Sequence, residues 1–323
     1  EAEAEIKTLM SVSSNVLSEA SCGVEITPVQ DGLLSLYKLS HPDVFFDRSE
    51  FIQLWCQLQH PHPNMPPEPS IMPQGSEPMW TGRQLISCML PDDFCYEHKG
   101  VVVRDGMFLD GILTKAVIGS GANGMSATLA RMSPEAYVEF ISDAQRAGCY
   151  FLREILGFTC GIQDFEPPPK AVAEAKEIVA DANNAVARAV EQCDNVDEEM
   201  LTFAMNKVLP LAKACMDKHL SANGLTDMVR SGSKGKMMNP TQIGLCVGQQ
   251  SIYGKRAQNP QNFTRTLPHF MEGENSPASR GFVSSNFFNG MNCTELFFHF
   301  QSAREGIYNS ACKTAESGYL YRK

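Results

Sequence analysis

The chain lacks the features that mark membrane and secreted proteins. None of its 323 residues belong to an apolar run of about 18 residues, the length needed to span a bilayer. The first ten residues, EAEAEIKTLM, have neither the basic start nor the apolar centre of a signal peptide. A hydrophobic content of 43% still supports folded cores in two or three domains. We therefore expect a globular, intracellular protein without membrane contact.

Closely spaced cysteines are absent as well. The eleven cysteines are scattered singly from Cys22 to Cys312, and no Cys-x-x-Cys pair occurs. An odd number of cysteines, spaced far apart in the sequence, indicates free thiols and argues against a disulfide framework. Four-ligand zinc sites use closely spaced ligand pairs, and His60 and His62 have no cysteine pair beside them. The spacing therefore predicts no structural zinc.

Charge is distributed unevenly along the chain, whose net charge is −10. From Met228 to Lys323 there are eleven Lys and Arg residues against five Asp and Glu residues, so the acidic excess lies in the earlier residues. A basic C-terminal third predicts contact with polyanions. Ordinary variation of charge along a chain is the alternative, and it stays open.

Hydrophobic periodicity predicts a mainly helical α+β protein. A helix is expected over residues 47–59, and it ends at a connector over 60–78 that contains seven prolines. Two short strands are expected to meet at Asp105-Gly106, the dipeptide of a tight hairpin. A further helix is expected from Ser133, where Pro134 supplies a favourable first helical position.

Residues 170–215 predict an antiparallel helical hairpin whose arms are joined by a polar turn at 194–198. Each arm of about 24 residues would span roughly 36 Å. Taken alone, such apolar stripes indicate packing between helices and no binding function. The stripe of the first arm is Val172, Ala175, Val179, Ala182, Val186 and Ala189, and that of the second is Met200, Ala204, Val208, Leu211 and Cys215.

A long helix is expected at the C-terminal end of the chain. Asn292 followed three positions later by Glu295 is a capping-box pattern, and no proline interrupts the residues up to Lys323. About 31 helical residues would span roughly 46 Å. Gly306 and Gly318 each cost about 1 kcal/mol relative to alanine and mark places where this helix can bend.

Motifs in the basic third carry a resemblance to a known family. The loop SGSKGK, the pair Gln249-Gln250, the trio at 254–256, the string RTLPHF at 265–270 and SRGFV at 279–283 occur in that order. Together they resemble the largest subunit of multisubunit DNA-directed RNA polymerases, those of RNA polymerase II and its archaeal and large-DNA-virus relatives.

The resemblance covers nearly the whole chain and implies an order of domains. Residues 79–84 resemble the start of the family's pore domain, residues 29–32 the end of its active-site domain, and residues 161–164 the start of its funnel. The implied segments are 1–45 (end of the active-site domain), 46–165 (pore domain with a β-hairpin), 166–227 (funnel hairpin), 228–290 (loops and helix facing the pore and nucleotide) and 291–323 (bridge helix).

Four departures from the family pattern stand out. The Asp-rich metal-binding loop and the trigger loop are not among these residues, and the sequence starts at Glu1 instead of Met. We therefore expect a subunit fragment, a processed product or a naturally split gene. The relaxed sequence elsewhere in the chain favours an origin in a large DNA virus over a cellular one. The family's adjacent glycines within the bridge helix are replaced here by Ser302 and Ala303.

The resemblance implies roles for individual residues but no catalytic or metal-binding residue in this chain. Lys234 matches the lysine that reaches the nucleotide triphosphate, although the motif alone indicates a plain basic turn. Residues that line the pore or brace the bridge helix are Gln249, Gln250, Lys255 and Arg256, and polar closure of a loop is an equal alternative. Residues of the bridge helix and template contact are His299, Arg304, Glu305, Lys313, Thr314, Ala315 and Tyr319. For His299, a satisfied interface histidine is favoured over an acid-base role.

The implied function is template-directed RNA synthesis, with Mg²⁺ bound by another part of the enzyme. The implied partners are the other segments of the largest subunit, the second-largest and smaller subunits, the DNA template and RNA–DNA hybrid, nucleoside triphosphates and a transcript-cleavage factor. A viral source would place the chain in host cytoplasm, nucleus or virion. The alternative function is a non-catalytic, polymerase-like scaffold or regulatory protein.

Overall fold

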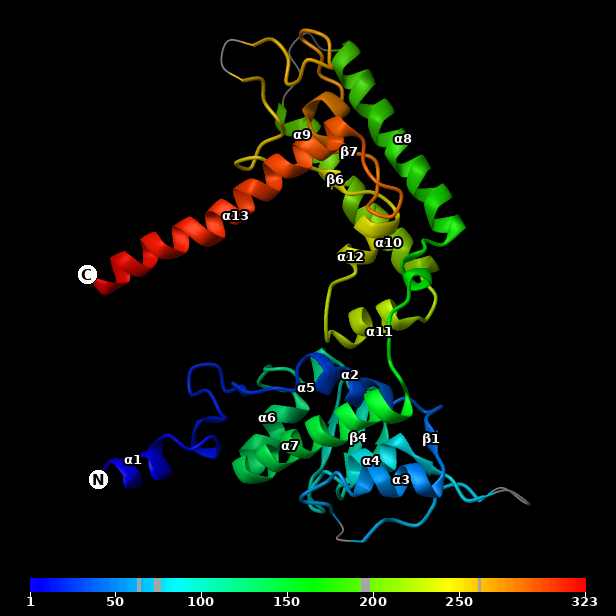
Figure 1. The fold of residues 1–323 in the computed structure, drawn as a ribbon, viewed down its shortest axis with the longest axis vertical. Helices are drawn as coiled ribbons and strands as arrows, with labels where there is room; N and C mark the ends of the chain where they lie inside the picture. The colour runs from blue at the N-terminus through cyan, green and yellow to red at the C-terminus, as the bar shows by residue number, and fades with distance from the viewer. Residues whose placement is uncertain (63–64, 73–76, 193–197, 261–262) are drawn as a thin grey trace. The chain divides into compact units, whose positions relative to one another are not determined.

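The computed structural model describes residues 1–62, 65–72, 77–192, 198–260 and 263–323, which form two compact units (Figure 1). The first unit comprises residues 1–160 and 226–235, and the second comprises residues 161–225 and 236–323. Helices predominate, and the described sheets are small and antiparallel, so the predicted α+β class is confirmed. Among the described helices, none is long and apolar enough to cross a bilayer.

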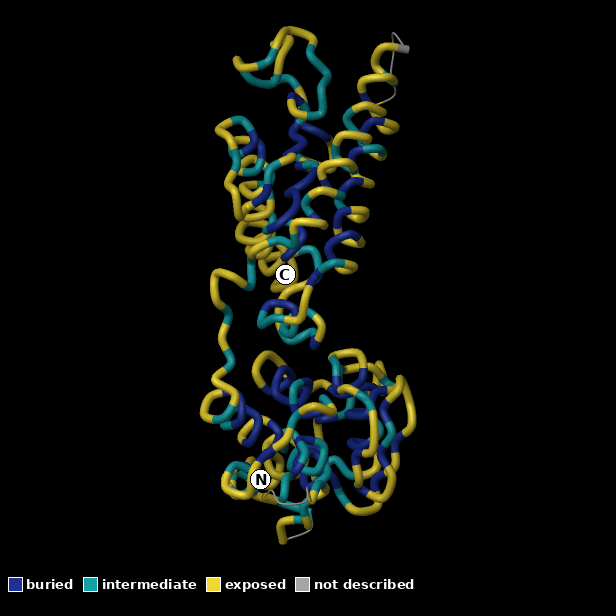
Figure 2. Tube along the Cα trace, turned by 90° about the vertical axis from the view of Figure 1, so that its right-hand side faces the viewer, coloured by how far each residue is buried: buried dark blue, intermediate teal, exposed yellow. Residues whose placement is uncertain are grey.

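The first unit is built around the pairing of two helices, α2 and α7. Their buried faces include Leu33, Leu36, Tyr137 and Phe140, which belong to one hydrophobic core. In Figure 2 the buried segments of the chain are dark blue. The buried carboxylate of Asp143 accepts hydrogen bonds of 2.9 Å from two backbone N–H groups of the loop after α3. The elements are α1 (Ala2–Leu9), α2 (Gln30–Leu39), β1 (Phe45–Phe46), α3 (Arg48–Trp55), β2 (Trp80–Thr81), α4 (Gly82–Ser87), β3 (Tyr96–His98), β4 (Val101–Arg104), β5 (Met107–Asp110), α5 (Lys115–Ile118), α6 (Met125–Met132) and α7 (Pro134–Tyr150).

The predicted hairpin is confirmed as β4 and β5, and β3 completes a three-stranded sheet that the sequence pattern did not predict. Asp105 and Gly106 both have positive φ angles, 49° and 71°, as this kind of tight turn requires. The predicted start of α7 is also confirmed, because the Ser133 hydroxyl accepts a hydrogen bond of 3.2 Å from the Ala136 N–H group.

The second unit contains the predicted helical hairpin. Its first arm is α8 (Pro169–Gln192), and its second arm consists of α9 (Glu198–Asn206) and α10 (Val208–His219). The thiol of Cys215, near the end of α10, lies 3.6 Å from the carbonyl oxygen of Ala171, near the start of α8, so the arms run antiparallel. Most of the predicted turn at 194–198 lies outside the described residues.

The predicted stripe of the second arm is wrong at two positions. Met200 and Leu211 are 61% and 53% exposed, and Leu201, Met205 and Ala212 are buried in their place. The arm is divided at Lys207, which separates α9 from α10. Pro210 has no N–H group to bond with the carbonyl of Asn206, so an unbroken helix is disfavoured there. The buried positions nevertheless keep steps of four and three across the division, from Leu201 and Met205 to Val208, Ala212 and Cys215. The prediction therefore chose the wrong one of two adjacent apolar residues at Met200 and at Leu211.

The remaining elements of the second unit lead into the long helix. They are α12 (Met238–Gly244), β6 (Gly248–Gln249), β7 (Phe282–Val283) and α13 (Cys293–Arg322). The predicted capping box is present, since Asn292 accepts from the Glu295 N–H group at 2.8 Å and Glu295 accepts from the Asn292 N–H group at 3.2 Å. The 30 residues of α13 confirm the predicted length, and Figure 1 shows the helix leaving the rest of its unit as an arm.

The start of α13 is fixed by a buried carboxylate. Glu295 also accepts hydrogen bonds from the Ser284 N–H group at 3.0 Å and the Ser285 N–H group at 3.2 Å. Burial disfavours the charged carboxylate, but the hydrogen bonds from Ser285, Asn292 and Ser284 outweigh it and hold the pKa of Glu295 below its usual value. The loop after β7 therefore determines the direction in which α13 starts.

Candidate functional site

The motifs that the sequence analysis singled out in the second unit meet around the short sheet of β6 and β7. This sheet pairs Gly248 with Val283 and Gln249 with Phe282. The Gln249 side chain donates a hydrogen bond of 2.9 Å to the carbonyl of Arg280. Backbone bonds also join the two segments, from the Gln250 N–H group to the Gly281 carbonyl at 2.9 Å. We call residues 248–257 the pore loop, after the role that the resemblance implies for them.

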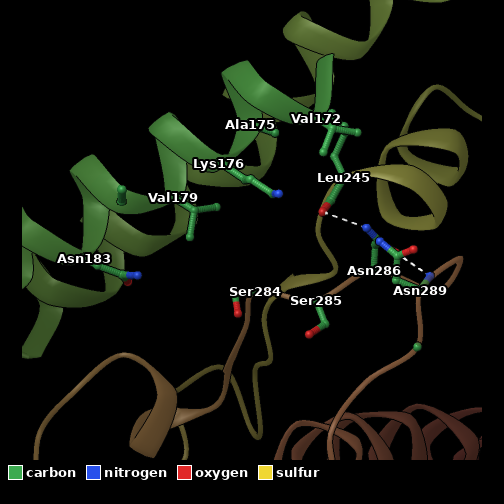
Figure 3. A pocket seen from close by; sticks show the side chains of 12 residues that line it. Val172, Ala175, Lys176, Val179, Asn183, Leu245, Ser284, Ser285, Asn286 and Asn289 are labelled. Carbon is green, nitrogen blue, oxygen red and sulfur yellow. Dashed lines mark hydrogen bonds between the residues drawn. The ribbon is translucent and has the colours of Figure 1, made fainter. Parts of the chain in front are cut away.

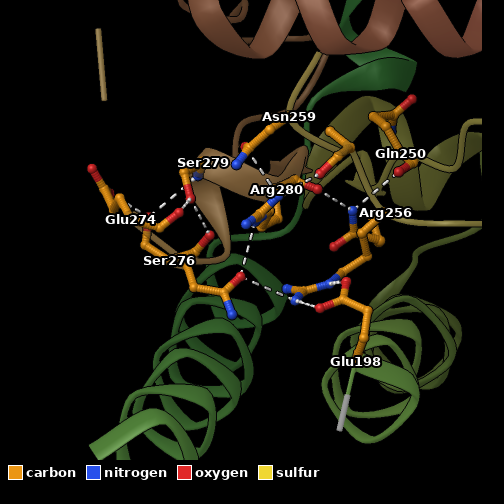
Figure 4. Close-up of polar contacts among 11 residues, drawn as sticks. Glu198, Gln250, Arg256, Asn259, Glu274, Ser276, Ser279 and Arg280 are labelled. Carbon is orange, nitrogen blue, oxygen red and sulfur yellow. Dashed lines mark hydrogen bonds and ion pairs between the residues drawn. The ribbon is translucent and has the colours of Figure 1, made fainter. Parts of the chain in front are cut away.

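Arg256 is the most deeply buried charged residue of the pore loop, with 1% exposure. Its Nε and Nη2 atoms donate to the two carboxylate oxygens of Glu198 at 2.7 and 2.8 Å, as Figure 4 shows. A guanidinium cannot lose its charge at physiological pH, so its burial requires a counter-ion with this paired geometry. Glu198 begins α9, and the ion pair therefore joins the pore loop to the helical hairpin.

A second arginine extends this polar network. Asn275 accepts from Arg280 Nε at 2.9 Å and lies 3.5 Å from Arg256 Nη2. Arg280 Nη1 also donates to the carbonyl of Ala257 at 3.3 Å and to the side chain of Asn259 at 3.2 Å. The network therefore connects the pore loop to the segment before β7 from several directions.

Electrostatics favour the charged form of Glu198. The hydrogen bond from Arg256 is the largest influence and lowers the pKa of Glu198, partial burial opposes it, and the positive charges of Arg256 and Arg280 add to the lowering. The pair thus remains ionised throughout the neutral range. The Glu198 side chain is half exposed, so solvent screens part of this interaction.

Two contacts attach the pore loop to α13. Gln250 donates its amide to the carbonyl of Gly248 at 3.0 Å, which turns its oxygen toward His299 Nδ1 at 3.1 Å. One turn and a half further along α13, the carboxylate of Glu305 accepts from the Tyr253 N–H group at 2.7 Å. His299 packs edge-on against Phe287, with ring centroids 5.5 Å apart. These contacts favour the interface role predicted for His299.

The exposed part of α13 carries the other predicted template contacts. Every residue from Ser310 to Lys323 is exposed, and Arg304 is exposed as well. The predicted residues Lys313, Thr314, Ala315 and Tyr319 therefore lie on a helix surface that the described residues of this unit leave uncovered. The hydroxyl of Thr314 donates to the carbonyl of Ser310, which keeps it close to the helix backbone.

Lys255 and Lys234 occupy turns with positive φ angles. Lys255 is exposed and follows Tyr253 and Gly254, whose φ angles are 51° and 76°. Lys234 is exposed in the first unit, between Gly232 and Gly235 with φ angles of 79° and 78°. A side chain at Gly232 would meet the Cβ atom of Lys115 at 2.7 Å, so only glycine fits there. The described geometry leaves the Lys234 ammonium accessible to an anion.

A pocket of about 440 Å³ lies between α8 and residues 284–290 of the second unit (Figure 3). Asn286 forms part of its wall and donates a hydrogen bond of 3.0 Å to the carbonyl of Gly244. The wall also contains the exposed Lys176. None of the site residues that the sequence predicted lines this pocket, so it is separate from the network of the pore loop.

Carboxylates suited to a two-metal polymerase site do not converge among the described residues. The one group of three metal-binding residue types found there is Glu174, Cys215 and His219, which contains a single carboxylate. Two-metal sites for nucleotidyl transfer depend on several carboxylate ligands. No cluster of carboxylates suited to such a metal centre is therefore found in the part of the chain that the structure describes.

Sequence reasoning did not predict the partners of the site residues. Glu198 appeared only as the end of a polar turn, and Asn275 was not singled out. The sequence around Arg256 is typical of a loop and gives no sign that this arginine is buried. Its counter-ion, Glu198, lies 58 positions away in the sequence. The requirement that a buried arginine have a carboxylate partner becomes useful only once the burial is known.

Comparison with known proteins agrees with the order of these segments. Three family models for RNA polymerase Rpb1 match the chain one after another. Domain 3 matches residues 15–165, domain 4 matches residues 176–283 and domain 5 matches residues 290–323. The chain is 31% identical to the RNA polymerase III subunit RPC1 of Trypanosoma brucei brucei, over all of this chain and 23% of that protein. It is 29% identical to the RNA polymerase II subunit RPB1-B of the same organism, over 99% of this chain and 19% of that protein.

An archaeal protein shows the same similarity. The Rpo1N subunit of Methanothermobacter thermautotrophicus is 29% identical over all of this chain and 40% of its own length. Each of these relatives is more than twice as long as the chain. The matches define the class, which is the subunits of DNA-directed RNA polymerases. Within that class, the chain belongs to the family of the largest subunit, Rpb1.

The ion pair of Arg256 generates a stability prediction. Glu198→Gln leaves the buried guanidinium without a counter-ion, which costs about 3–5 kcal/mol for a fully buried pair. Because Glu198 is half exposed, we expect about 1–3 kcal/mol lower free energy of unfolding of the second unit. Glu177→Gln, at an exposed carboxylate on α8, is the matched control and should change stability by less than about 0.5 kcal/mol.

The effect should depend on pH in a defined direction. The pKa of Glu198 is depressed below 4.5 in the folded protein, so its stabilising contribution is complete above that value and is lost as the pH falls through the folded pKa. Denaturant unfolding of wild type and Glu198→Gln should therefore differ at pH 7 and converge in acid. Equal stabilities of the two variants at pH 7 would show that the pair contributes nothing.

Proposed function

We propose that this chain takes part in template-directed RNA synthesis, supplying the pore, the funnel and the bridge helix of an RNA polymerase. The main support is the consecutive match to domains 3, 4 and 5 of the largest subunit. The geometry of the second unit is suited to these roles, because the pore loop holds the first part of α13 and leaves the rest exposed. The hairpin of α8, α9 and α10 corresponds to the proposed funnel.

The proposed partners follow from the function. They are the remaining segments of the largest subunit, the second-largest and smaller subunits, nucleoside triphosphates, the DNA template and the RNA–DNA hybrid, and a transcript-cleavage factor at the funnel. We propose that Mg²⁺ is held by carboxylates elsewhere in the assembly. The site of action is inside the cell, in host cytoplasm, nucleus or virion if the source is a large DNA virus.

Purification of the tagged chain from its native source tests this function against a non-catalytic scaffold. We expect the chain to isolate with a second-largest polymerase subunit, and the assembly to incorporate nucleotides on a DNA template when Mg²⁺ is added. Mass spectrometry identifies the subunits, and template-dependent incorporation of labelled nucleotide measures the activity. Isolation with unrelated proteins and no synthesis would favour the scaffold.

Lys234 is proposed to contact the triphosphate of the incoming nucleotide. Lys234→Ala removes one charge-assisted hydrogen bond, worth about 1.5–3 kcal/mol when desolvated. Nucleotide affinity or maximal rate in the assembled enzyme should fall by roughly tenfold to a hundredfold. Lys236→Ala removes an equal charge two residues away and should have a much smaller effect. Equal kinetics for the two variants would leave Lys234 as a turn residue.

Bending of α13 is proposed to accompany each step along the template. Ser302 and Ala303 stiffen the first half of the helix, because replacing a glycine with such a residue lowers the free energy of the helical form by about 0.5–1 kcal/mol. Ser302→Gly combined with Ala303→Gly should alter elongation rate and pausing while nucleotide affinity stays nearly unchanged. Elongation on a defined template, with nucleotide titrations, measures both. Unchanged rates and pauses would place the flexing at Gly306 or Gly318.

A further inference from the structure

Three side chains of different metal-binding types meet between the arms of the helical hairpin. Glu174 lies on α8, and Cys215 and His219 lie four residues apart on one face of α10. Glu174 Oε1 is 2.7 Å from His219 Nε2, and Glu174 Oε2 is 3.4 Å from Cys215 Sγ. One ligand atom from each residue lies within 4.8 Å of the others.

This donor set has the chemistry of a zinc-type ion. Zn²⁺ binds thiolate sulfur at about 2.3 Å and imidazole nitrogen or carboxylate oxygen at about 2.0–2.2 Å, so its ligand atoms lie roughly 3–4 Å apart. The observed separations bracket that range. A thiolate and a carboxylate together balance a charge of 2+, and the neutral imidazole adds the third bond. Ions that prefer oxygen ligands alone, such as Mg²⁺, are disfavoured by the sulfur.

The burial of the three residues suits a metal site that is enclosed on one side and open to solvent on the other. Cys215 is buried, the His219 side chain is 16% exposed, and the Glu174 side chain is 41% exposed. Cys215 and His219 are therefore enclosed by neighbouring side chains, while the more exposed Glu174 side chain has room to adjust. The exposed side also admits a water molecule as fourth ligand.

Other interactions of the cluster compete with an ion. Lys218 Nζ lies 3.4 Å from Glu174 Oε1, and its charge would repel a cation, but the Lys218 side chain is 67% exposed and is free to turn into solvent. In the hydrogen-bonded arrangement, the Cys215 thiol donates to Glu174 and the His219 ring is paired with the same carboxylate. An ion would replace both contacts with direct bonds.

We propose that Glu174, Cys215 and His219 bind one Zn²⁺ or similar transition-metal ion that joins the two arms of the hairpin. The sulfur–metal bond forms as the thiol proton leaves to solvent, with no change in oxidation state. The ion crosslinks the start of α8 to the end of α10, which fixes the separation of the arms at that end. The proposal departs from the expectation of no zinc, which considered only ligand pairs close together in sequence.

Metal titration of the full 323-residue chain tests this proposal without reference to polymerase activity. After chelator treatment, Co²⁺ should bind at one equivalent per chain with a thiolate-to-cobalt charge-transfer band, and Zn²⁺ should displace it. Cys215→Ser should abolish that band. His219→Gln and Glu174→Gln should weaken binding by more than the roughly 10–100-fold that is typical of losing an outer-shell partner.

Two matched variants control for nonspecific effects. Cys246→Ser changes another buried thiol of the same unit and should retain one equivalent. Lys218→Ala removes the competing charge beside the site and should bind at least as tightly as wild type. Glu174→Gln alters a partly exposed side chain, so it gives a result even if Cys215→Ser does not fold. Absence of the band in wild type, or equal binding by Glu174→Gln and wild type, would overturn the proposal.

Discussion

The structure of the second unit depends on the burial of one positive charge. Arg256 is permanently ionised and buried, so the pore loop is stable where Glu198 accepts hydrogen bonds from its Nε and Nη2 atoms. That requirement fixes the pore loop against the start of α9. Because Gln250 and Tyr253 of the same loop contact α13, one ion pair links the position of the hairpin to that of the long helix.

The same linkage divides α13 into two parts with different surroundings. Phe298 is buried, and His299 and Glu305 form hydrogen bonds with the pore loop. The residues from Ser310 onward are exposed. A helix fixed at one end bends most easily just beyond its support. Gly306 immediately follows Glu305, so the lower helix propensity of glycine coincides with the end of the supported part.

Local signals were sufficient for most of the fold. The Asp105-Gly106 turn, the Ser133 cap and the Asn292 capping box each act within a few residues, so the sequence pattern shows them directly. The predicted stripe of the second hairpin arm failed at Met200 and Leu211 because each is followed by another apolar residue, Leu201 or Ala212, and the sequence pattern did not decide which of the two is buried.

The site residues were found through motifs, but their partners depend on tertiary contacts. Arg256 and Glu198, or Glu174 and Cys215, are more than 40 positions apart, and residue type alone gives many equally suitable pairings. The roles predicted for Lys234, Lys313 and the other substrate-facing residues concern molecules outside the chain, so the fold places these side chains without testing their roles.

The replacement of glycine by Ser302 and Ala303 is consistent with this division of α13. Both residues lie between His299 and Glu305, the two positions tied to the pore loop. Glycine at these two positions would make local unwinding between the two contacts easier, whereas Ser and Ala lower the free energy of the helical form. Stiffening this segment transfers bending to Gly306 and beyond, where the helix surface carries Lys313 and Tyr319. With Ser302 and Ala303 in place of glycine, the part of α13 that bends most easily is the part beside the proposed position of the template.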